Sequence, residues 1–515
     1  MHYLNVMSPM INFEEIRNGI FYVDKSMLIE RITTKLRTSQ KYICITRPRR
    51  FGKTINANML AAYFMRGFDS SGLFDNLNIS ACDIYKQHIN QHNVIHIDFS
   101  VLPNPCETYK EYIAWINGCI IHDIKEAYGL DVGKGEPVSS LLSRTQDNFI
   151  FVLDEWDSVF YKDFMGEKEK QAYLEFIKNL LKDKAYVELA YMTGVLPIAK
   201  YSSGSELNMF DEYNFMNDNI FDDYFGFQED EVKRICEHQN KITYEDLKQW
   251  YDGYYTSTGR SLFNPRSVTK ALERGKCLNF WTETGPMNEI ADCIEHNVND
   301  VKEDVVKLVS GISVEIELDG YSAVDLQLDT RDEILSAMVV YGFLSYYEGL
   351  LTIPNKELMA KFQNVLKRES MGVLARITQR SKEMLEATIS GNEEKVAEIL
   401  EIVHNQEIPF ITYKDENSLS IVVTLSYLYA REIYTIEREE KTGKGYCDFI
   451  FYPIYKRNPA IILELKYGKS PEEAIQQIKD KNYMSRVQDA NKIVICGINY
   501  ESEKHHSCKI EIIEK

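Results

Sequence analysis

The sequence predicts an α/β protein of several domains, with a parallel sheet in its N-terminal half and a smaller α/β domain near its C-terminal end. At 515 residues the chain is too long for one ordinary core, since domains average about 150 residues. In the N-terminal half, short apolar strand patterns alternate with helical patterns, which is typical of a parallel sheet. Further along, two strand patterns precede a helical pattern and another strand, at 446–453, 460–466, 470–483 and 491–499.

Composition places the chain among folded proteins of reducing compartments. Apolar residues make up 44% and charged residues 27%, the balance of a globular protein. Ten cysteines are scattered without a CxxC pair or a zinc-type His/Cys spacing, which favours reduced, mostly buried thiols. The first residues, MHYLNVMSPMINFEE, lack a secretion-signal pattern, and no apolar run is long enough to span a membrane. We therefore expect a cytoplasmic protein without a membrane partner.

The net charge limits which partners are plausible. The formal charge is −19, which argues against a protein that coats nucleic acid through an overall positive surface. Residues 441–515 carry 13 Lys and Arg against 10 Asp and Glu, so this tail is basic while the rest of the chain is acidic. If any part of the chain meets nucleic acid, the tail is the better candidate.

A basic loop follows the first predicted strand. Residues 41–46, KYICIT, have a strand pattern, and INANMLAAYFM after the loop has a helical pattern. Backbone N–H groups in such a loop, together with the positive end of the helix dipole, bind phosphate. Lys53 would reach the β- and γ-phosphates, and Thr54 would hold Mg²⁺. The predicted nucleotide-binding set in this loop is Arg47, Arg49, Arg50, Phe51, Gly52, Lys53 and Thr54.

The loop departs from the usual phosphate-binding pattern at one position. Arg47 stands where G-x-x-x-x-G-K-[ST] has its first glycine. The motif GKT alone is equally compatible with an ordinary turn between a strand and a helix. The assignment therefore depends on a second signal elsewhere in the chain.

That second signal is a pair of acids at the end of a buried strand pattern. FIFVLDE at 149–155 has the form of a parallel strand that delivers carboxylates to the carboxyl edge of a sheet. We expect Asp154 to coordinate Mg²⁺ and Glu155 to orient or deprotonate the attacking water. For Asp157 we expect a helix-start cap, with support of the metal site as the alternative.

Two further strand patterns are expected in the same sheet. HNVIHIDFS at 92–100 is expected beside the first strand, with Asp98 near the site. ELAYMTG at 188–194 would bring Thr193 to the same edge. There Thr193 would either contact the γ-phosphate or simply end the strand.

Seven short motifs occur in order along the N-terminal half: FYVDKS at 21–26, RPRRFGKT at 47–54, LDEWD at 153–157, TGV at 193–195, YFGF at 224–227, WYDGY at 250–254 and NPRSV at 264–268. Over about residues 10–290 they resemble the bacterial AAA-ATPase-like family, in which an arginine normally occupies the position of Arg47. The resemblance implies that Tyr22 and Asp24 lie near the nucleotide base or order the loop before the first strand. It also implies a helical lid with Asp252 and Arg266, where Arg266 would contact the γ-phosphate unless NPR only starts a helix.

The middle of the chain, from about 285 to 385, has helical patterns and one short hairpin. LSAMVVYGFLSYYEGLLTIPN contains a helix and two strands joined by Glu348 and Gly349. The family resemblance implies a helical and winged-helix-like region here. Residues 374–403 form an amphipathic helix pair with a break at Gly391 and Asn392, which we expect to act as a connector.

Two carboxylates and a lysine are expected to converge in the C-terminal part. YCDFIFYP at 446–453 and AIILELK at 460–466 form a predicted hairpin, and alternation puts Glu464 and Lys466 on one face of the second strand. With Asp448 they would suit metal-dependent phosphodiester hydrolysis, in which acids hold Mg²⁺ and the ammonium positions or activates water. A salt-bridged surface hairpin is the alternative.

The order strand, strand, helix, strand with D…ExK resembles the PD-(D/E)XK nuclease superfamily over about 385–515, in particular the form fused behind AAA-ATPase-like domains. Gln477, which precedes Tyr483 on the predicted helix, fits either a supporting role near the acids or a solvated helix face. Glu416 is a further candidate carboxylate from the first helix of this domain. Cys447 replaces the proline in the superfamily's name, a residue that only shapes the backbone.

The sequence therefore predicts four parts: an AAA-ATPase-like P-loop core at 1–205, its helical lid at 206–290, the helical and winged-helix-like middle region at 291–384, and a nuclease-like domain at 385–515. We expect an ATP- and Mg²⁺-dependent protein in which the nucleotide state of the ATPase core controls a DNA nuclease domain. The sequence is compatible with a homo-oligomer. The resemblance suggests bacterial defence or mobile-element biology. The main alternative is an ATP-dependent signalling or scaffold protein with a non-cleaving tail, and a small-molecule kinase is a third reading that leaves the tail unexplained.

Overall fold

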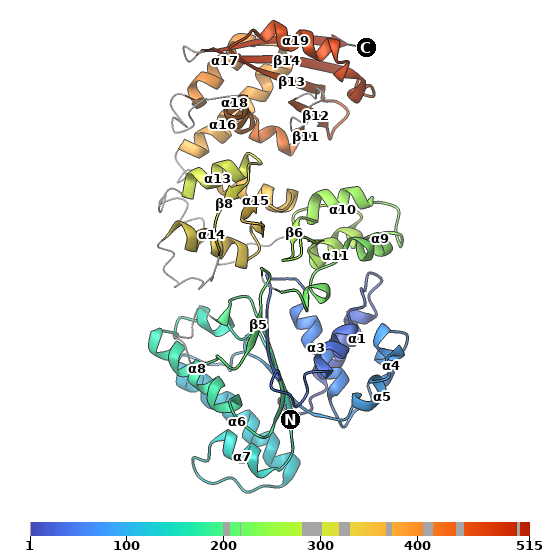
Figure 1. Cartoon of the computed structure of the whole chain (residues 1–515), viewed down its shortest axis with the longest axis vertical. Coiled ribbons are helices and arrows are strands. Elements are labelled where there is room, and N and C mark those ends of the chain that lie inside the picture. The colour runs from blue at the N-terminus through green and yellow to red at the C-terminus, as the bar shows by residue number, and fades with distance from the viewer. Residues whose placement is uncertain are drawn as a thin grey trace. The chain divides into compact units, whose positions relative to one another are not determined.

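The chain forms two compact units, each built from two stretches of sequence (Figure 1). The first contains Met1–Ile290 and Glu315–Leu358, and the second contains Ala291–Val314 and Met359–Lys515. The structure is a computed structural model that describes residues 2–198, 206–216, 218–280, 301–318, 330–366, 373–404, 416–438, 448–501 and 505–514. No helix in these ranges combines the length and the apolar content needed to cross a bilayer.

A five-stranded parallel sheet forms the centre of the first unit, in the order β2-β3-β4-β1-β5. The strands are β1 (Tyr42–Thr46), β2 (Asn93–Asp98), β3 (Phe149–Asp154), β4 (Val187–Gly194) and β5 (Asp211–Tyr213). Because all are parallel, their carboxyl ends lie along one edge of the sheet. That edge carries the loop after β1 and the acids after β3.

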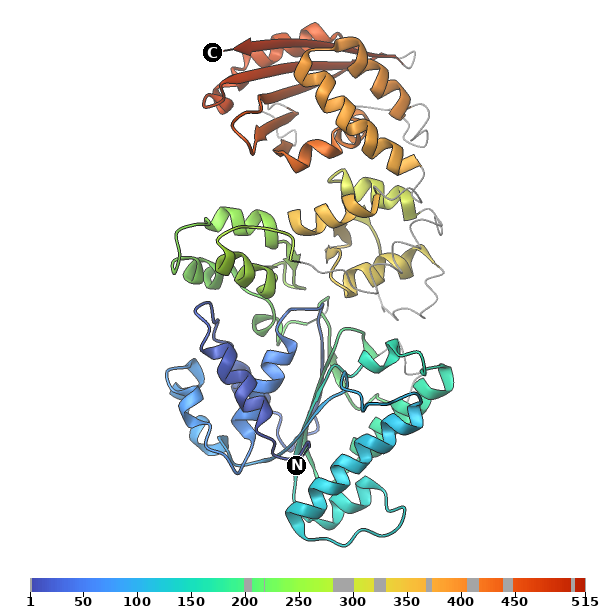
Figure 2. The ribbon, with the colours of Figure 1, turned by 180° about the vertical axis from the view of Figure 1, so that it is seen from behind.

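Helices cover both faces of this sheet, with α1 and α3 on one side and α6, α7 and α8 on the other (Figures 1 and 2). Alternate strand residues enter two separate apolar cores, so Ile43 and Ile45 pack on the α3 side while Cys44 packs on the α6 side. The helices are α1 (Ser8–Arg17), α2 (Met27–Thr33), α3 (Lys53–Phe64), α4 (Ser71–Phe74), α5 (Tyr85–His88), α6 (Tyr109–Tyr128), α7 (Val138–Arg144) and α8 (Glu167–Leu181).

A small helical subdomain with its own apolar core follows β5. It contains α9 (Glu229–Cys236), α10 (Tyr244–Tyr251), the hairpin β6 (Tyr254–Tyr255) and β7 (Ser261–Leu262), and α11 (Pro265–Arg274). Gly253 lies against a later stretch of the same unit, since a Cβ there would sit 2.1 Å from the Pro354 carbonyl oxygen. The Tyr254 hydroxyl donates to the Gly342 carbonyl at 3.1 Å. Residues 315–358 thus complete the first unit.

The middle of the chain contains the predicted helix and hairpin. Strands β9 (Ser345–Tyr347) and β10 (Leu350–Thr352) pair antiparallel, and the two joining residues, Glu348 and Gly349, both have positive φ, as a tight hairpin turn requires. The other elements of this stretch are α13 (Val301–Val309), β8 (Val314–Glu315), α14 (Arg331–Val340) and α15 (Lys356–Leu366).

The second unit is built on a mixed sheet in the order β11-β12-β13-β14-β15. Only β13 and β14 are parallel, and the other described pairs are antiparallel. Helix α19 lies on one face, with α16 and α18 on the other (Figures 1 and 2). The elements are α16 (Val373–Ser390), α17 (Glu393–Ile402), α18 (Glu416–Ser426), β11 (Tyr434–Arg438), β12 (Phe449–Pro453), β13 (Ala460–Tyr467), α19 (Pro471–Asp480), β14 (Lys492–Tyr500) and β15 (His506–Glu514).

Three expectations differ from the structure. Strand β2 pairs with β3, and both β3 and β4 separate it from β1, so the expected neighbourhood of the strands at 92–100 and 41–46 was wrong. The helix pair α16 and α17 packs on the second sheet and is no simple connector, because the Glu393 carboxylate accepts the Ile510 N–H at 3.0 Å. The predicted boundary at 384/385 falls inside α16.

Candidate functional site

The loop between β1 and α3 forms a turn that requires glycine at its end. Gly52 occupies the N-cap of α3 with φ +93°. A Cβ at this position would meet no atom within 4 Å, so the backbone conformation alone favours glycine. The N–H groups of the first turn of this 12-residue helix, which have no partner within a helix, lie directly after the loop.

Lys53 is buried at the centre of this loop. Its Nζ donates to the carbonyl oxygens of Arg47, at 2.9 Å, and Pro48, at 3.0 Å. Burial lowers the pKa of Lys53, while the nearby carboxylates of Asp157 and Glu155 favour the charged form. Carbonyl groups of the loop itself thus accept the hydrogen bonds of the lysine.

Two acids follow β3 at the same edge. Asp154 is 1% exposed, and its carboxylate accepts the hydroxyl of Thr193 from the end of β4. Glu155 is exposed and has φ +52°, a conformation that costs energy in a residue other than glycine. Partial removal from water and the neighbouring Asp154 both raise the pKa of Glu155, while Lys53 lowers it. The predicted group of acids and lysine is therefore together in space.

Asp157 holds a loop and does not cap a helix. No side-chain cap bond forms at the start of the following 3₁₀ helix, so the predicted cap was wrong. The buried Asp157 carboxylate instead accepts N–H groups from Val195, at 3.2 Å, and Leu196, at 2.9 Å, directly after β4. Asp98 is the register partner of Asp154, as expected for a residue near the site.

His96 on β2 lies on the same strand face as Asp98 and is a residue that the sequence analysis missed. Its Nε2 is buried without a hydrogen-bond partner in the described structure. Burial lowers the pKa of His96, and the nearby Asp154 and Asp98 oppose that shift. A histidine within a strand gives no local signal of this neighbourhood.

The remaining loop residues contact protein groups. Arg50 Nη1 donates to the Phe280 carbonyl at 2.9 Å, and the positive charge of Arg266 on α11 contributes to lowering the Arg50 pKa, after burial. Phe51 is fully buried against Tyr254, with ring centroids 5.0 Å apart. Arg49 is half-buried. The exposed Arg266 therefore lies near the loop, although it also occupies the first turn of its helix.

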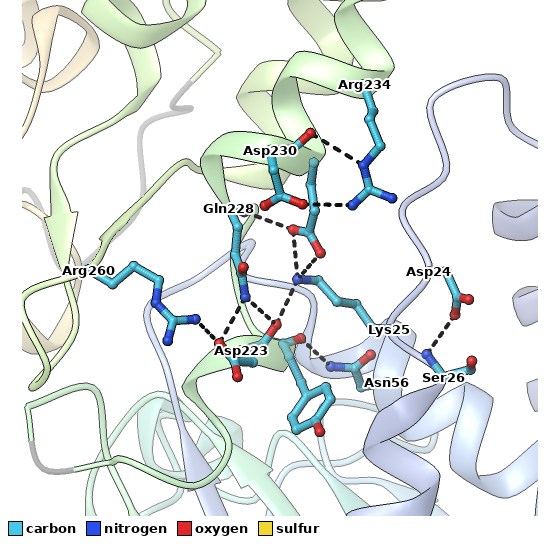
Figure 3. Close-up of polar contacts among 11 residues, drawn as sticks. Asp24, Lys25, Ser26, Asn56, Asp223, Gln228, Asp230, Arg234 and Arg260 are labelled. Carbon is cyan, nitrogen blue, oxygen red and sulfur yellow. Dashed lines mark hydrogen bonds and ion pairs between the residues drawn. The ribbon is translucent and has the colours of Figure 1, made fainter. Parts of the chain in front are cut away.

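Polar contacts join the segment before α2 to the start of the lid (Figure 3). Lys25 Nζ contacts both oxygens of Glu231 on α9, at 2.7 and 2.8 Å, and the Asp223 carbonyl at 2.8 Å. Gln228 and Arg260 donate to the Asp223 carboxylate. These contacts hold α9 on the core of the first unit.

Asp24 and Asp252 have structural contacts in the described part of the chain. The Asp24 carboxylate accepts the Ser26 N–H at 2.8 Å and the Asn78 N–H at 2.7 Å, which orders the loop before α2. Asp252 accepts the Ser261 hydroxyl at 2.5 Å across the β6–β7 hairpin. Tyr22 packs on Phe13, with ring centroids 6.3 Å apart.

A second polar cluster lies on the sheet of the second unit, on the face covered by α19. Lys466 Nζ contacts Glu464 Oε1 at 2.9 Å and Gln477 Oε1 at 2.8 Å, and the Gln477 amide also donates to Glu464. Asp448 lies opposite Glu464, where its Oδ2 accepts the Leu465 N–H at 2.7 Å and its N–H contacts Glu464 Oε2 at 3.4 Å. The two acids, the lysine and the glutamine thus converge.

Strand alternation explains this convergence. Ala460 and Ile462 precede Glu464 on the same face of β13 and pack in one apolar core with Ile475 and Ile478 of α19. The face thus changes from apolar to polar at Glu464, which is 3% exposed, and Lys466 is 7% exposed. Burial and the charge of Asp448 raise the pKa of Glu464 to about 7, although Lys466 lowers it. Two close carboxylates, with the ammonium of Lys466 beside one of them, suit a bound divalent metal.

The predictions for four peripheral residues have different outcomes. Gln477 is part of the cluster and not of a solvated helix face. Tyr483 is not on the helix, because α19 ends at Asp480 and Tyr483 starts a 3₁₀ turn. Cys447 lies outside the described residues, and so does the side chain of Glu416.

The parallel sheet with its loop, lysine and acids defines the first unit as a P-loop ATPase fold, and the mixed sheet with its acids has the architecture of the PD-(D/E)XK fold. Residues 9–203 match the family model described as a predicted AAA-ATPase, and residues 414–510 match that of the PD-(D/E)XK nuclease superfamily. The chain therefore carries an AAA-ATPase-like domain and a PD-(D/E)XK nuclease superfamily domain. No curated protein matches the chain.

Several solved structures are similar to the chain. A Walker-type ATPase of Pyrococcus abyssi is 10% identical, with a TM-score of 0.34 over 66% of this chain and 94% of that one. The ORC2 protein of Aeropyrum pernix in ADPNP–ADP complexes is 10% identical, with a TM-score of 0.31 over 69% and 99%. The ORC1 protein of Aeropyrum pernix in complex with DNA is 11% identical, with a TM-score of 0.28 over 71% and 97%.

Proposed function

We propose that the first unit binds and hydrolyses ATP with Mg²⁺, and that the second unit cleaves DNA with a divalent metal under the control of the nucleotide state. The observation that carries the proposal is the group of Asp448 with the buried Glu464 and Lys466, in a chain that also brings Lys53 to two acids. A salt-bridged surface hairpin would be exposed and would not need a second carboxylate beside the first.

In the first unit, phosphate binding would draw Lys53 away from the carbonyls of Arg47 and Pro48. Thr54 and Asp154 would hold Mg²⁺, which when bound supplies positive charge to the phosphates. Thr193 fixes the Asp154 carboxylate through its hydroxyl. Glu155 would orient the attacking water, and its raised pKa makes it a stronger base than an ordinary glutamate.

In the second unit, Asp448 and Glu464 would hold the metal, which when bound polarises the scissile phosphate and its water. Lys466 would place its ammonium beside that phosphate, and Gln477 holds both Lys466 and Glu464 in position. The basic composition of residues 441–515 supports a polyanionic substrate. The described cysteines are free thiols, which supports a cytoplasmic location.

Cleavage is tested on plasmid DNA. With Mg²⁺ or Mn²⁺ the purified chain is expected to nick the plasmid, and Lys466→Ala or Asp448→Asn is expected to lower the rate by about a hundredfold or more, because each removes a group needed at the phosphate. Lys395→Ala, on the exposed surface of α17, is the matched control and should leave the rate unchanged. Nicking that persists in both site variants contradicts the nuclease assignment and favours a non-cleaving, binding tail.

ATP hydrolysis is tested by phosphate release. Lys53→Ala is expected to suppress both binding and turnover, whereas Glu155→Gln is expected to bind ATP and to lose about a hundredfold or more in turnover, since only the positioning of water is affected. Lys178→Ala on the surface of α8 serves as the control. Unchanged hydrolysis in Lys53→Ala would show that the phosphate-binding loop is misassigned.

A further inference from the structure

Arg47, at the position of the first P-loop glycine, points into the protein and away from the loop. Its side chain is 1% exposed and that of its partner, Asp218, is 0% exposed. The guanidinium carbon lies 5.1 Å from the centre of the Phe225 ring. Such a side chain has no open path to a nucleotide held by the N–H groups of the loop.

The Arg47 guanidinium connects three separate segments. Its Nη1 donates to the Thr46 carbonyl at 2.9 Å, at the end of β1, and to the Tyr213 carbonyl at 2.7 Å, at the end of β5. Its Nη2 forms the ion pair with Asp218. One arginine thus ties the start of the phosphate-binding loop to the chain that leaves β5.

Asp218 extends this connection toward the lid. Its Oδ1 accepts the N–H groups of Ile220, at 2.7 Å, and Phe221, at 2.8 Å, which shape the turn before the lid. Its carbonyl accepts the Ser257 hydroxyl at 2.6 Å, from the turn of the β6–β7 hairpin. The ion pair therefore fixes the path of the chain from the sheet to the lid.

The same residue also controls Lys53 through its backbone. The Arg47 carbonyl is one of the two oxygens that receive the Lys53 ammonium. At the other end of the loop, the Gly226 N–H donates to the Phe51 carbonyl at 3.1 Å. The loop is thus held at both ends by the segment that leads to the lid, and a shift of Arg47 would displace the oxygen that holds the lysine.

We propose that Arg47 and Asp218 form a positioning pair for nucleotide binding, which holds the phosphate-binding loop on the segment leading to the lid, and that Arg47 does not contact the phosphates. This inference rests on the proposed ATP site. Removal of one partner of this ion pair leaves the other as a buried charge without an opposite charge beside it. Removal of both charges leaves no such uncompensated charge. The pair therefore acts as a unit.

The test is a double-mutant cycle on ATP and ADP affinity, measured by titration calorimetry. Arg47→Met and Asp218→Asn are each expected to weaken the affinity for ATP and the affinity for ADP by the same factor, about tenfold or more. The factor is the same because neither side chain contacts the γ-phosphate, the group that distinguishes the two nucleotides. The double variant is expected to bind no more weakly than the weaker single variant. Arg66→Met, which breaks the exposed pair with Asp147, is the control and should bind both nucleotides normally.

The proposal is overturned if Arg47→Met loses affinity for ATP but not for ADP while Asp218→Asn binds both nucleotides normally. That result would indicate that Arg47 contacts the γ-phosphate directly. If Arg47→Met does not fold, Asp218→Asn decides, because it keeps the side-chain shape and removes only the charge, and normal binding by this variant overturns the proposal. Lys53→Ala separates a failure of the proposed ATP site from a failure of the proposed positioning pair. Normal ATP binding by Lys53→Ala contradicts the ATP site itself, whereas lost binding there with normal binding in the pair variants contradicts only the pair.

Discussion

At the scale of single residues, the same side-chain type has different roles that depend on its surroundings. Lys53 and Lys466 are both buried lysines beside acids, but Lys53 contacts backbone carbonyls whereas Lys466 contacts Glu464 and Gln477. A lysine held by carbonyls is ready to exchange them for phosphate oxygens. A lysine held by a carboxylate instead remains paired with a group that would also hold a metal.

Two neighbouring histidines of the first unit give a residue-scale prediction. His88 Nδ1 lies 3.0 Å from His92 Nε2, His92 Nδ1 lies 3.1 Å from Glu188, and Arg37 pairs with Glu188 at 2.8 Å. Burial and His92 both lower the pKa of His88, which Glu188 opposes. The unfolded chain then binds more protons than the folded chain below about pH 6.5, so the free energy of unfolding falls as the pH drops through that value.

Urea denaturation at about pH 7.5 and about pH 5.5 measures this effect. The first unit of the wild type is expected to lose more stability between these pH values than the first unit of His88→Gln, which has no imidazole at this position. Equal losses in the two proteins would contradict the assignment. Lys86→Gln, an exposed change on the same short helix, should retain the wild-type pH dependence.

At the scale of elements, helix α19 brings Gln477 to the acids of β13, and its close approach to β14 depends on Gly497. A Cβ at Gly497 would lie 2.3 Å from the Pro471 carbonyl oxygen and 2.9 Å from the Ala474 Cβ. The helix therefore rests directly on the backbone of the strand beside Glu464. The position of Gln477 depends on this contact.

Gly497→Ala is expected to move α19 off the sheet and to destabilise the second unit by about 1–3 kcal/mol, as added volume does in a packed core. Cleavage should fall as well, because Gln477 would no longer reach Lys466 and Glu464. Denaturation and plasmid nicking measure the two effects. Gln476→Ala on the exposed face of α19 is the control, expected within about 0.5 kcal/mol of wild type. Wild-type stability and rate in Gly497→Ala would exclude this tight packing.

Elements with a strong local pattern were predicted from the sequence. The strands β1, β3 and β4, the hairpin β12–β13 and the helix α19 with its Ser470 cap follow from periodicity and capping residues. The order of the strands in the sheet was not predicted, because β1 pairs with β4, 148 residues further along the chain, and several strands share one apolar pattern. The edge strands β5 and β15 have mixed exposure and therefore weak patterns.

The residues of the candidate sites also fall into those that a local pattern predicts and those that only distant contacts place. Lys53, Asp154, Asp448, Glu464 and Lys466 could be proposed from the sequence because each follows or lies within a strand pattern. The partner of Arg47 was not found, because Asp218 lies about 170 residues away in a stretch without a motif. Asp157 was expected as a cap because the position after a strand suits one, but its backbone partners come from the distant loop after β4. Tertiary contacts, which local patterns do not encode, decided both cases.

At the scale of the whole molecule, two units with separate cores predict two unfolding transitions. A ligand that binds only one folded unit stabilises that unit, by about 2.7 kcal/mol at a hundred times its dissociation constant. In calorimetry, a non-hydrolysable ATP analogue with Mg²⁺ should raise the midpoint temperature of the first unit's transition further than Mg²⁺ alone does. A divalent cation without nucleotide should raise the midpoint temperature of the second unit's transition.

Two matched variants assign these transitions. Lys53→Ala should lose the shift caused by the ATP analogue and keep the shift caused by the cation, and Asp448→Asn should show the reverse. Plasmid nicking measured with ATP, with ADP and without nucleotide then tests control between the units. A nicking rate that is the same in all three conditions would leave two independent enzymes on one chain.

The interleaved path of the chain affects how the protein is made. Residues 315–358 belong to the first unit but leave the ribosome after 291–314, which belong to the second. Until the later stretch emerges, the Tyr254 hydroxyl lacks the Gly342 carbonyl and Gly253 lacks its neighbour Pro354. The nascent N-terminal unit therefore stays incomplete during this stage of translation. An expression fragment of the ATPase-like domain alone should for the same reason include residues 315–358.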